Sequence, residues 1–513
     1  MNQETRASSN EAKANEPPGL DIFCTPENSD FLSKVHYEDL NNTEREIRLL
    51  KILPDSGSGF VECELLPSVK LANVRKRYLA LSYCAGDPRN TNAILVNGAK
   101  CNVFANLHHA LMTVRYFWES RPQKKDLLLW VDQICINQVN LAERSHQVGF
   151  MKDIYQNAEE TLVCLSVNET EGRGMQWLIQ LEQYYIDHLL EKHLHETRIS
   201  TEGSKDDSTF RSYGVITYLR DMINENDFAD NWIEFFHVLK SPWWDRAWVF
   251  QEFIISARMT FLFGEHSISY SKMVPFLLGI CTATLESICE PHVRRHQVFT
   301  RLVERSQYST EEIEEAANKV YNMIMTKDEW IHRSDLEYLL VHNSNSQASD
   351  PRDKIYSVLG LAHPGYGIVP DYSPTNDLNK VLIETTRQII LHTDCLAVLI
   401  YLDHSAPHHN NAIGLPSWAV NWMVKINTYG YKSGNSILKS TGFMCHCIKD
   451  ETADASFSQL AHPEEPGRIT TALEVWGVCL DYNMQKWSSE TIYKGLRDHT
   501  IIAERTFSSE EMH

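Results

Sequence analysis

The stretch LLLWVDQICINQVNLAERSHQV, residues 127–148, decides which fold the chain is predicted to adopt. The apolar run from Leu127 to Val131 has the length and composition of a buried strand. It ends at Asp132, and a short polar loop with Cys135 and Asn137 separates it from the start of a helix. Packing alone does not require an acid, a thiol and amides at the end of a buried strand. This edge is therefore the first place to look for function.

The segments on both sides of this stretch repeat the alternation of strand and helix. The compact apolar run 78–83 precedes it, and the apolar positions of 104–119 recur with the period of a helix. After the loop, Asn140 is placed to cap a helix, with Glu143 three residues further on as a capping-box partner. Residues 161–167 then have the pattern of another strand. This alternation predicts an α/β fold, a parallel sheet flanked by helices and joined by right-handed crossovers.

Shorter strand signals surround this alternation. Strand-like pieces occur at 47–50 and 59–63. The dipeptide Asn97-Gly98 after an apolar run predicts a hairpin turn, and 259–270 has the pattern of a second hairpin around Gly264-Glu265.

The length of 513 residues is too great for one ordinary hydrophobic core, so several domains are expected. The helical region beyond the α/β domain has a start signal at Asp350-Pro351, and 395–402 and 473–480 have the pattern of strands. The end of the chain lacks a clear stop signal, which favours a truncated C-terminal module. The predicted organisation is a disordered tail over 1–28, the α/β domain over 44–270 with an insertion around 170–230, a mainly α-helical region over 271–392, and a mixed α/β region with a few strands over 393–513.

The charge balance argues against nucleic acid as the main partner. The chain has 68 acidic and 48 basic residues, a formal net charge of -20, whereas phosphate contacts require an excess of Lys and Arg on one face. The N-terminus lacks the apolar core of a signal peptide, and the longest near-apolar stretch, 276–285, is too short to span a bilayer. We expect no membrane contact, a cytoplasmic location, and 12 cysteines that are free and mostly buried.

Polar residues gather at the predicted carboxyl ends of the strands, where open parallel sheets bind ligands. One interpretation is a pocket for a polar small molecule, in which Arg89 pairs with a phosphate and Asp132 with a hydroxyl or a cation. The other is that Asp132 and Asn137 satisfy backbone groups of the turn, and spacing alone favours this second interpretation. The candidate substrate-binding residues at this edge are Ser82, Tyr83, Asp87, Arg89, Asp132 and Asn137.

The segment DRAWVFQEFIISA, residues 245–257, carries a second candidate site. On a helix, Trp248 and Glu252 share a face because they are four residues apart, and Trp248 is a further candidate substrate-binding residue. A carboxylate beside an indole can be desolvated, which raises its pKa and suits it to acid–base or cation-stabilising chemistry. The alternative is an exposed Glu252 on an amphipathic helix, paired with Arg246, and spacing alone favours it.

Metal and nucleophile motifs are weak. The run Cys445-His446-Cys447 has no second half at zinc spacing, so no metal is expected. Cys135 is the one nucleophile candidate, but its nearest histidine, His146, lies well into the following helix, which argues against a Cys–His hydrolase. Neither a GxxxxGK[ST] phosphate-binding loop nor a GxGxxG motif is present, and no cofactor is predicted.

The same stretches resemble a known family, the heterokaryon incompatibility (HET) domain of filamentous fungi. Five blocks occur in the family's order, so the resemblance is specific, and it reaches most of the chain. One departure is Ala85, at a position where the family usually has tryptophan. The blocks are YLALSYCAGDP, VNGAKCNVFANLHHAL, LLLWVDQICINQVNLAERSHQVGFMKDIYQNAEETLVCLS, SPWWDRAWVFQEF and DPRDKIYSVLGLA.

The resemblance implies a role in non-self recognition between fungal cells, in which activation triggers programmed cell death. It also implies a fold similar to that of Toll/interleukin-1 receptor (TIR) domains. In TIR enzymes a helical glutamate acts in cleaving the nicotinamide–ribose bond of NAD, and the matching residue here is Glu252. NAD is then a candidate substrate rather than a cofactor, and loss of nicotinamide leaves an oxocarbenium-like centre that a carboxylate can stabilise.

Two hypotheses from different classes remain open. In the first, the chain is a TIR-like NAD glycohydrolase in which Glu252 is the catalytic residue. In the second, it is a non-enzymatic signalling module that acts through oligomerisation and protein–protein contacts, with the region beyond 271 holding it inactive. Both lead us to expect self-association and a partner protein, of unknown identity, whose difference is sensed.

Overall fold

The computed structural model describes residues 28–35, 37–121, 126–165, 169–188, 226–264, 266–289, 303–304, 306, 308–330, 334–393, 397–401, 415–416, 418–426, 454–461 and 469–476. The expected N-terminal tail, apart from its last residue, and the expected insertion around 170–230, over residues 189–225, lie outside this description. The chain divides into two compact units, which are best considered separately. The first comprises residues 1–147, 153–244 and 256–321, and the second residues 148–152, 245–255 and 322–513.

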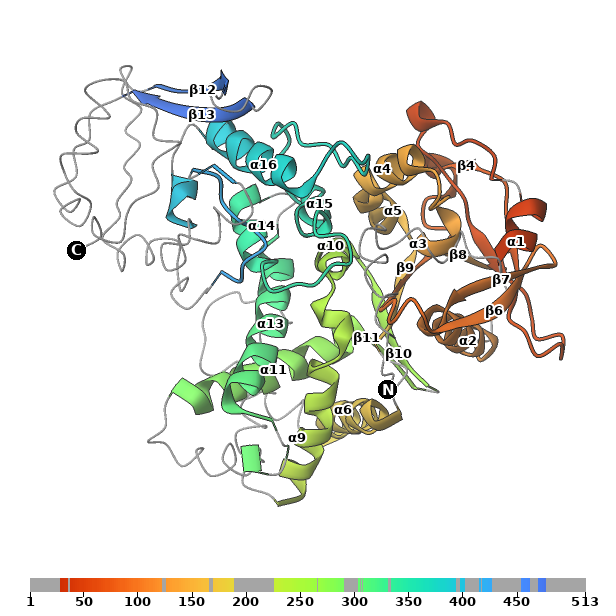
Figure 1. Ribbon diagram of the computed structural model, residues 1–513. Helices are drawn as coiled ribbons and strands as arrows, with labels where there is room; N and C mark the ends of the chain where they lie inside the picture. The colour runs from red at the N-terminus through yellow and green to blue at the C-terminus, as the bar shows by residue number, and fades with distance from the viewer. Residues whose placement is uncertain are drawn as a thin grey trace, which may run out of the picture. The chain divides into compact units, whose positions relative to one another are not determined.

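Over the described residues, a mixed β-sheet of nine strands forms the centre of the first unit (Figure 1). Four of its neighbouring pairs are parallel, β8–β5, β5–β9, β9–β10 and β3–β6, and the other four are antiparallel. In spatial order the strands are β11 (His266–Ser269), β10 (Met259–Phe263), β9 (Glu160–Cys164), β5 (Leu79–Tyr83), β8 (Leu127–Trp130), β2 (Leu50–Ile52), β3 (Glu62–Leu65), β6 (Thr91–Val96) and β7 (Ala99–Phe104).

The predicted α/β class is right, and the predicted parallel sheet is found only in part, because the sheet is mixed. Four adjacent strands, β8, β5, β9 and β10, are parallel. The alternation predicted the first three of them. Antiparallel pairing enters through the two hairpins, because a connection of a few residues reverses the chain direction. Asn97 and Gly98 both have positive φ, 51° and 75°, in the β6–β7 turn, as the dipeptide predicted. The short strand β2 adds two further antiparallel pairs.

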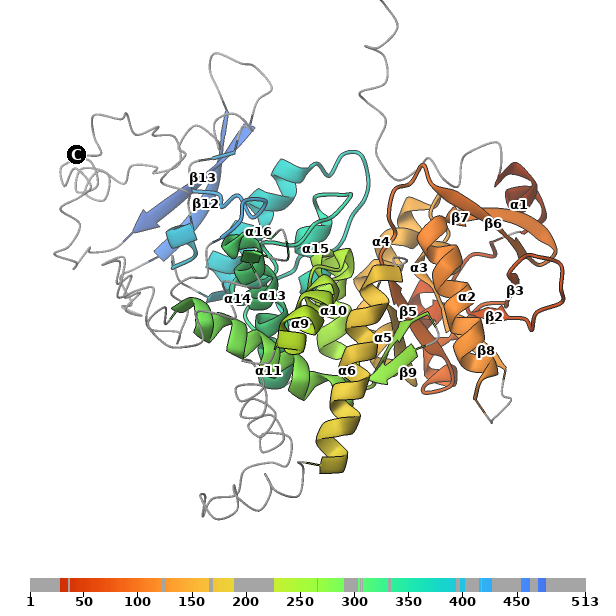
Figure 2. The same ribbon diagram turned by 90° about the horizontal axis from the view of Figure 1, so that it is seen from below.

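The central strands are buried on both faces, which explains their near-continuous apolar sequences. Every residue of β5, β9 and β10 is buried. Helix α2 (Ala105–Glu119) lies along the sheet and packs against β5, β6, β7, β9 and β10 (Figure 2). Helices α6 (Glu169–His188) and α11 (Tyr270–Cys289) pack against β11, and α6 also packs against α9 (Asn226–Leu239).

The remaining elements of the first unit are short. Helix α5 packs on the sheet through Tyr155, whose hydroxyl donates to Leu81 O at 3.0 Å and whose ring meets that of Trp130 edge-on. The short elements are α1 (Ser29–Lys34), η2 (Asn42–Glu44), β1 (Glu46–Ile47), β4 (Val69–Lys70), η3 (Leu71–Val74), α3 (Asp132–Cys135), α4 (Leu141–Gly149), α5 (Met151–Asn157) and η4 (Pro242–Asp245).

The second unit is mainly helical over its described residues, in agreement with the predicted pattern. Two predictions there need correction. Residues 397–401 form the 3-10 helix η5 rather than a strand, and the helix expected to start at Pro351 starts at Asp353, because Asp350 accepts the Arg352 backbone N–H and caps a preceding turn. Its elements are α10 (Ala247–Ile255), the end of α13 (Thr310–Glu329), α14 (Leu336–His342), α15 (Asp353–Leu359), α16 (Leu378–Thr393), η5 (Ala397–Tyr401), β12 (Asp454–Ala461) and β13 (Ile469–Trp476).

The antiparallel pair β12–β13 only partly matches the predicted C-terminal strands. The expected strand at 473–480 overlaps β13, and its residues from 477 onward lie outside the description. The partner strand β12 has no counterpart among the predictions. In its sequence, DASFSQLA, apolar and polar residues alternate only over the first five positions, which is too short a pattern to predict a strand.

Helix α10 is almost wholly buried, and α15 of the same unit packs directly on it. From Val249 to Ile255 every residue is buried, so this helix is apolar on nearly all sides. Close approach is possible because Gly360 follows α15. A Cβ at that position would lie 2.1 Å from Gln251 Oε1 and 2.9 Å from Lys152 Cβ.

We therefore expect Gly360→Ala to lower the free energy of unfolding by about 1–3 kcal/mol, because the added methyl overpacks this contact. The backbone of Gly360 is helical, with φ -61°, so conformational strain contributes nothing to the loss. Gly149→Ala is the control, since the nearest atom to its Cβ would be Pro370 Cδ at 4.0 Å. Urea unfolding measures the free energy of unfolding of both variants. Equal values would contradict the close packing at Gly360.

Candidate functional site

The carboxyl ends of β5 and β8 meet at one edge of the sheet in the first unit. The two strands pair in parallel, with Leu79 opposite Leu129, so the residues that follow them emerge side by side. Tyr83 Oη donates to Asp132 Oδ1 at 3.1 Å. The structure thus brings together two of the residues predicted to line this edge.

Asp132 uses part of its polar capacity to hold its own loop. Its Oδ1 also accepts the backbone N–H of Gln133 at 2.7 Å, and its carbonyl accepts from Gln138 Nε2 at 2.8 Å. These bonds agree with the capping interpretation. The second carboxylate oxygen, Oδ2, accepts no hydrogen bond from the described residues, and the side chain is only half-buried. Capping and ligand binding are therefore compatible at this residue.

A buried ion pair holds the rest of the loop. Arg48 Nη1 lies 2.6 Å from Glu143 Oε1, and their side chains are only 4% and 5% exposed. The same Glu143 oxygen accepts the backbone N–H of Asn137 at 2.8 Å, and Arg48 Nη1 donates to Cys135 O at 3.1 Å. The pair thus fixes both halves of the Cys-Ile-Asn-Gln segment, and each charge is hydrogen-bonded as a buried charge must be.

Two further contacts complete this arrangement. Asn140 Oδ1 accepts the backbone N–H of Glu143 at 3.1 Å, so the predicted cap of α4 is confirmed. The carboxylate of Glu143 binds Arg48 instead of closing the capping box. The ring of Tyr37 lies against the Arg48 guanidinium, 4.8 Å from ring centroid to Cζ, and its hydroxyl donates to Ile134 O at 2.8 Å.

Cys135 is a buried thiol in this loop, not an activated nucleophile. Its residue is 1% exposed, and burial raises the pKa of the thiol to about 12. It is therefore protonated at neutral pH, and only the thiolate attacks. No group of three or more His, Cys, Asp or Glu side chains in the described part of the chain could hold a metal ion. Across the same residues, no helix has the length and apolar character to cross a membrane.

The other predicted ligands of this edge are differently engaged. Ser82 is 1% exposed and its hydroxyl accepts from Trp243 Nε1 at 2.8 Å, which ties β5 to the Pro242–Asp245 turn. Asp87 and Arg89 form an exposed ion pair of 2.7 Å, and the hydrogen bonds from Arg89 lower the pKa of Asp87 to about 2. Asn137 is held through its backbone, and its side chain makes no hydrogen bond to the described residues.

Trp248 and Glu252 lie on α10, which belongs to the second unit. Glu252 is 3% exposed, whereas Trp248 is half-buried. The alternative of an exposed glutamate on an amphipathic helix is therefore wrong. A carboxylate this deeply buried is the condition that the acid–base hypothesis requires, although its chemical role stays a prediction.

Lys327 holds the end of α10 that carries Glu252. Its ammonium donates to Phe253 O at 2.8 Å and to Ile254 O at 3.0 Å, two carbonyls of the last helical turn. A cation at a helix C-terminus is favoured by the helix dipole and by the unsatisfied carbonyls. Burial lowers the pKa of Lys327 to about 8, so the contact carries a desolvation cost.

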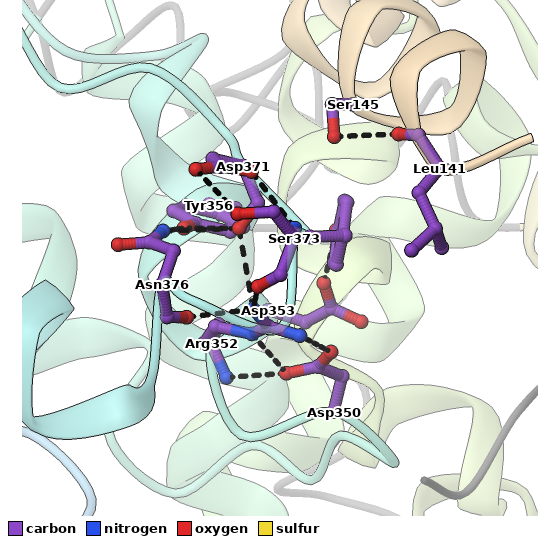
Figure 3. Close-up of polar contacts among 10 residues, drawn as sticks. Leu141, Ser145, Asp350, Arg352, Asp353, Tyr356, Asp371, Ser373 and Asn376 are labelled. Atoms are coloured by element: carbon purple, nitrogen blue, oxygen red, sulfur yellow. Dashed lines mark hydrogen bonds and ion pairs between the residues drawn. The ribbon is translucent and has the colours of Figure 1, made fainter.

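The Asp-Pro-Arg-Asp-Lys block at 350–354 forms a clamp on a neighbouring loop of the second unit (Figure 3). Arg352 Nε and Nη2 bind the Asp350 carboxylate at 3.0 and 2.8 Å, and Nη1 donates to Asn376 O at 2.7 Å. Asn376 Nδ2 in turn donates to Tyr356 Oη at 2.9 Å. The polar groups of this block are used within the protein, which indicates a structural role.

Comparison with known proteins identifies the domain that contains both candidate sites. Residues 78–252 match the family described as heterokaryon incompatibility protein (HET). The chain carries a HET domain. It is also 29% identical over 385 residues to heterokaryon incompatibility protein 6, OR allele, of Neurospora crassa, an alignment that covers 68% of this chain and 54% of the relative. The chain thus spans about half the length of that relative, and no solved structure matches it.

The HET match runs from Tyr78, directly before β5, to Glu252 on α10, and so includes every predicted site residue. The family assignment drawn from the sequence blocks is therefore confirmed. Sequence reasoning missed the Arg48–Glu143 pair and the buried amide of Gln133. The available signal for the first was Arg48 between Ile47 and Leu49, where a charge interrupts an apolar run.

Removing one charge of the buried pair should destabilise the first unit strongly. We expect Glu143→Gln to lower the free energy of unfolding by about 3–5 kcal/mol, because Arg48 is left buried and uncompensated. Arg45→Gln is the matched control, since its ion pair with Asp153 is exposed and is worth about 1 kcal/mol or less. Denaturant unfolding separates the two cases, and equal losses would show that the Arg48–Glu143 pair is not buried in solution.

Lys327 should produce a pH-dependent stability. Its pKa is about 8 when folded and 10.5 in the reference state, so the unfolded chain binds more protons between these values and stability rises with pH across that window. The advantage of wild type over Lys327→Met should therefore grow by about 1–2 kcal/mol between pH 8 and pH 9.5. Urea titrations at both pH values measure it, and a constant difference would mean that Lys327 is solvated.

Proposed function

We propose that this HET-domain protein acts in fungal non-self recognition and triggers programmed cell death by TIR-like cleavage of NAD. The family match supports the first part, and so does the likeness to a protein named for heterokaryon incompatibility. The single observation that carries the enzymatic part is the burial of Glu252, at 3% exposed, on a helix within the HET domain. Glutamate side chains are rarely fully buried unless they are paired or take part in function.

The proposed reaction breaks the C–N bond between nicotinamide and ribose. The bonding electron pair leaves with nicotinamide, and the ribose becomes an oxocarbenium-like cation. Glu252 stabilises that positive charge electrostatically, in a setting where low local polarity strengthens the interaction. Water then adds to the ribose carbon and loses a proton, which gives ADP-ribose. The step needs no redox partner.

The arrangement of the sheet is compatible with the TIR-like assignment. Four adjacent strands, β8, β5, β9 and β10, are parallel, and polar residues follow β5 and β8 at their carboxyl ends. Within the first unit taken by itself, Tyr83 and Asp132 are the proposed contacts for a polar ligand, because Asp132 Oδ1 and Tyr83 Oη already meet at 3.1 Å. Self-association and recognition of a variable partner protein belong to the same proposal.

The test is release of nicotinamide from NAD by the purified full chain at high protein concentration. We expect wild type to release it and Glu252→Gln to lose about 100-fold or more of the rate, the loss typical of removing one charge-stabilising group. Glu384→Gln, on α16 of the same unit, is the control and should keep the rate. A thermal melt of each variant establishes that it is folded.

Absence of nicotinamide release from folded, assembled wild type would contradict the enzymatic proposal. The interaction module would then be the better account of the HET domain. In that case Glu252→Gln would leave cell death intact, whereas surface changes that block oligomerisation would abolish it.

A further inference from the structure

Gln133 is a buried amide with an unused polar atom beside Asp132. The residue is 4% exposed, and its Nε2 has no hydrogen-bond partner among the described residues. Its Oε1 lies 3.5 Å from Tyr83 Oη, at the limit of a hydrogen bond, and Tyr83 bonds better to Asp132 at 3.1 Å. Buried polar groups in proteins are almost always paired, so an exception of this kind calls for an explanation.

The exception does not depend on how the amide is turned. If Oε1 faces Tyr83, the free atom is the donor Nε2. If the amide is rotated by half a turn, Nε2 donates to Tyr83 Oη and the free atom is the acceptor Oε1. In both orientations one amide atom is left over. Asp132 Oδ2, on a half-buried side chain, also accepts no hydrogen bond from the described residues, so two neighbouring side chains each offer a polar atom to a ligand.

These two atoms together define the chemistry of a ligand. Asp132 Oδ2 is an acceptor and requires a donor. Gln133 offers either a donor or an acceptor, according to its orientation. A hydroxyl group both donates and accepts, and a pair of adjacent hydroxyls satisfies Asp132 and Gln133 in either case. An anion is disfavoured by the Asp132 carboxylate, and a metal ion is disfavoured because the neighbours are an amide and a phenol rather than further carboxylates.

We propose that Gln133, with Tyr83 and Asp132, binds the adjacent hydroxyls of a ribose. A ligand can reach the half-buried Asp132 from solvent. Gln133 selects for a hydroxyl, because a ligand without one leaves the buried amide unpaired. The inference rests on the proposed function only for the choice of ribose among diols. The geometry concerns the first unit alone and is independent of Glu252.

The experiment is binding of ADP-ribose to the full chain, measured by calorimetry, together with the melting temperature of each variant. Gln133→Met keeps the volume and removes the amide. We expect it to weaken ADP-ribose binding by about 10- to 100-fold and to leave the melting temperature unchanged or raised, because a buried unsatisfied group is lost. Gln156→Met, on the exposed face of α5, is the control and should change neither quantity.

A second comparison tests the hydroxyls themselves. Wild type should bind ribose 5-phosphate more tightly than 2-deoxyribose 5-phosphate, and Gln133→Met should bind both equally. ADP-ribose binding that survives in Gln133→Met, or that is absent from wild type, would overturn the assignment and leave a bound water as the partner of the amide. So would a fall of several degrees in the melting temperature of Gln133→Met, which would make Gln133 structural.

The outcome is separable from that of the proposed reaction. If NAD is not cleaved but ADP-ribose binding depends on Gln133, the proposed glycohydrolase fails and the ribose site stands. If nicotinamide is released and Gln133→Met has no effect on binding, the reverse holds.

Discussion

The loop that carries Asp132 depends on the buried ion pair between Arg48 and Glu143. The charges come from segments 95 residues apart, and between them they bind the carbonyl of Cys135 and the amide of Asn137. Two opposite charges are brought out of water at a large desolvation cost, which only a fully hydrogen-bonded geometry can offset. The gain is therefore not general stability but one defined conformation for a loop that has little regular structure of its own.

The same need to hold loops explains why many polar residues of the HET-matching region need not take part in binding or catalysis. Ser82 ties β5 to Trp243, Gln138 supports the carbonyl of Asp132, and Arg352 beyond the match clamps a loop of the second unit. Such side chains hold backbone segments that lack a helix or strand partner. Polar residues at the end of a strand can therefore serve to hold the following loop as well as to bind a ligand.

The sequence predicted what local periodicity controls and missed what depends on distant partners. The strands from 78–83 to 161–167, the helix between 104 and 119 and the cap at Asn140 all followed from spacing, as did the hairpin at Asn97-Gly98. Position in the sheet did not, because β2 inserts beside β8 through pairings that no local pattern encodes. For the same reason the burial of Glu252 was not predictable from the pattern of its helix, whose neighbours come from more than 70 residues away, as the Lys327 contact illustrates.

Chemistry at the sheet edge is therefore best sought in polar atoms that the fold leaves over. A side chain whose hydrogen bonds are all made within the protein can be explained by structure alone. One atom of the Gln133 amide cannot, because burial of an unpaired polar atom is unfavourable unless something outside the chain completes it. Beside it, the half-buried Asp132 has a second carboxylate oxygen, Oδ2, that accepts no hydrogen bond from the described residues. Asp132 was predicted as a site residue from the sequence, whereas its neighbour Gln133 was not. Their unused polar atoms can bind the same kind of group. A ligand that satisfies both would bind with the specificity of two hydrogen bonds in a site already held rigid by Arg48 and Glu143.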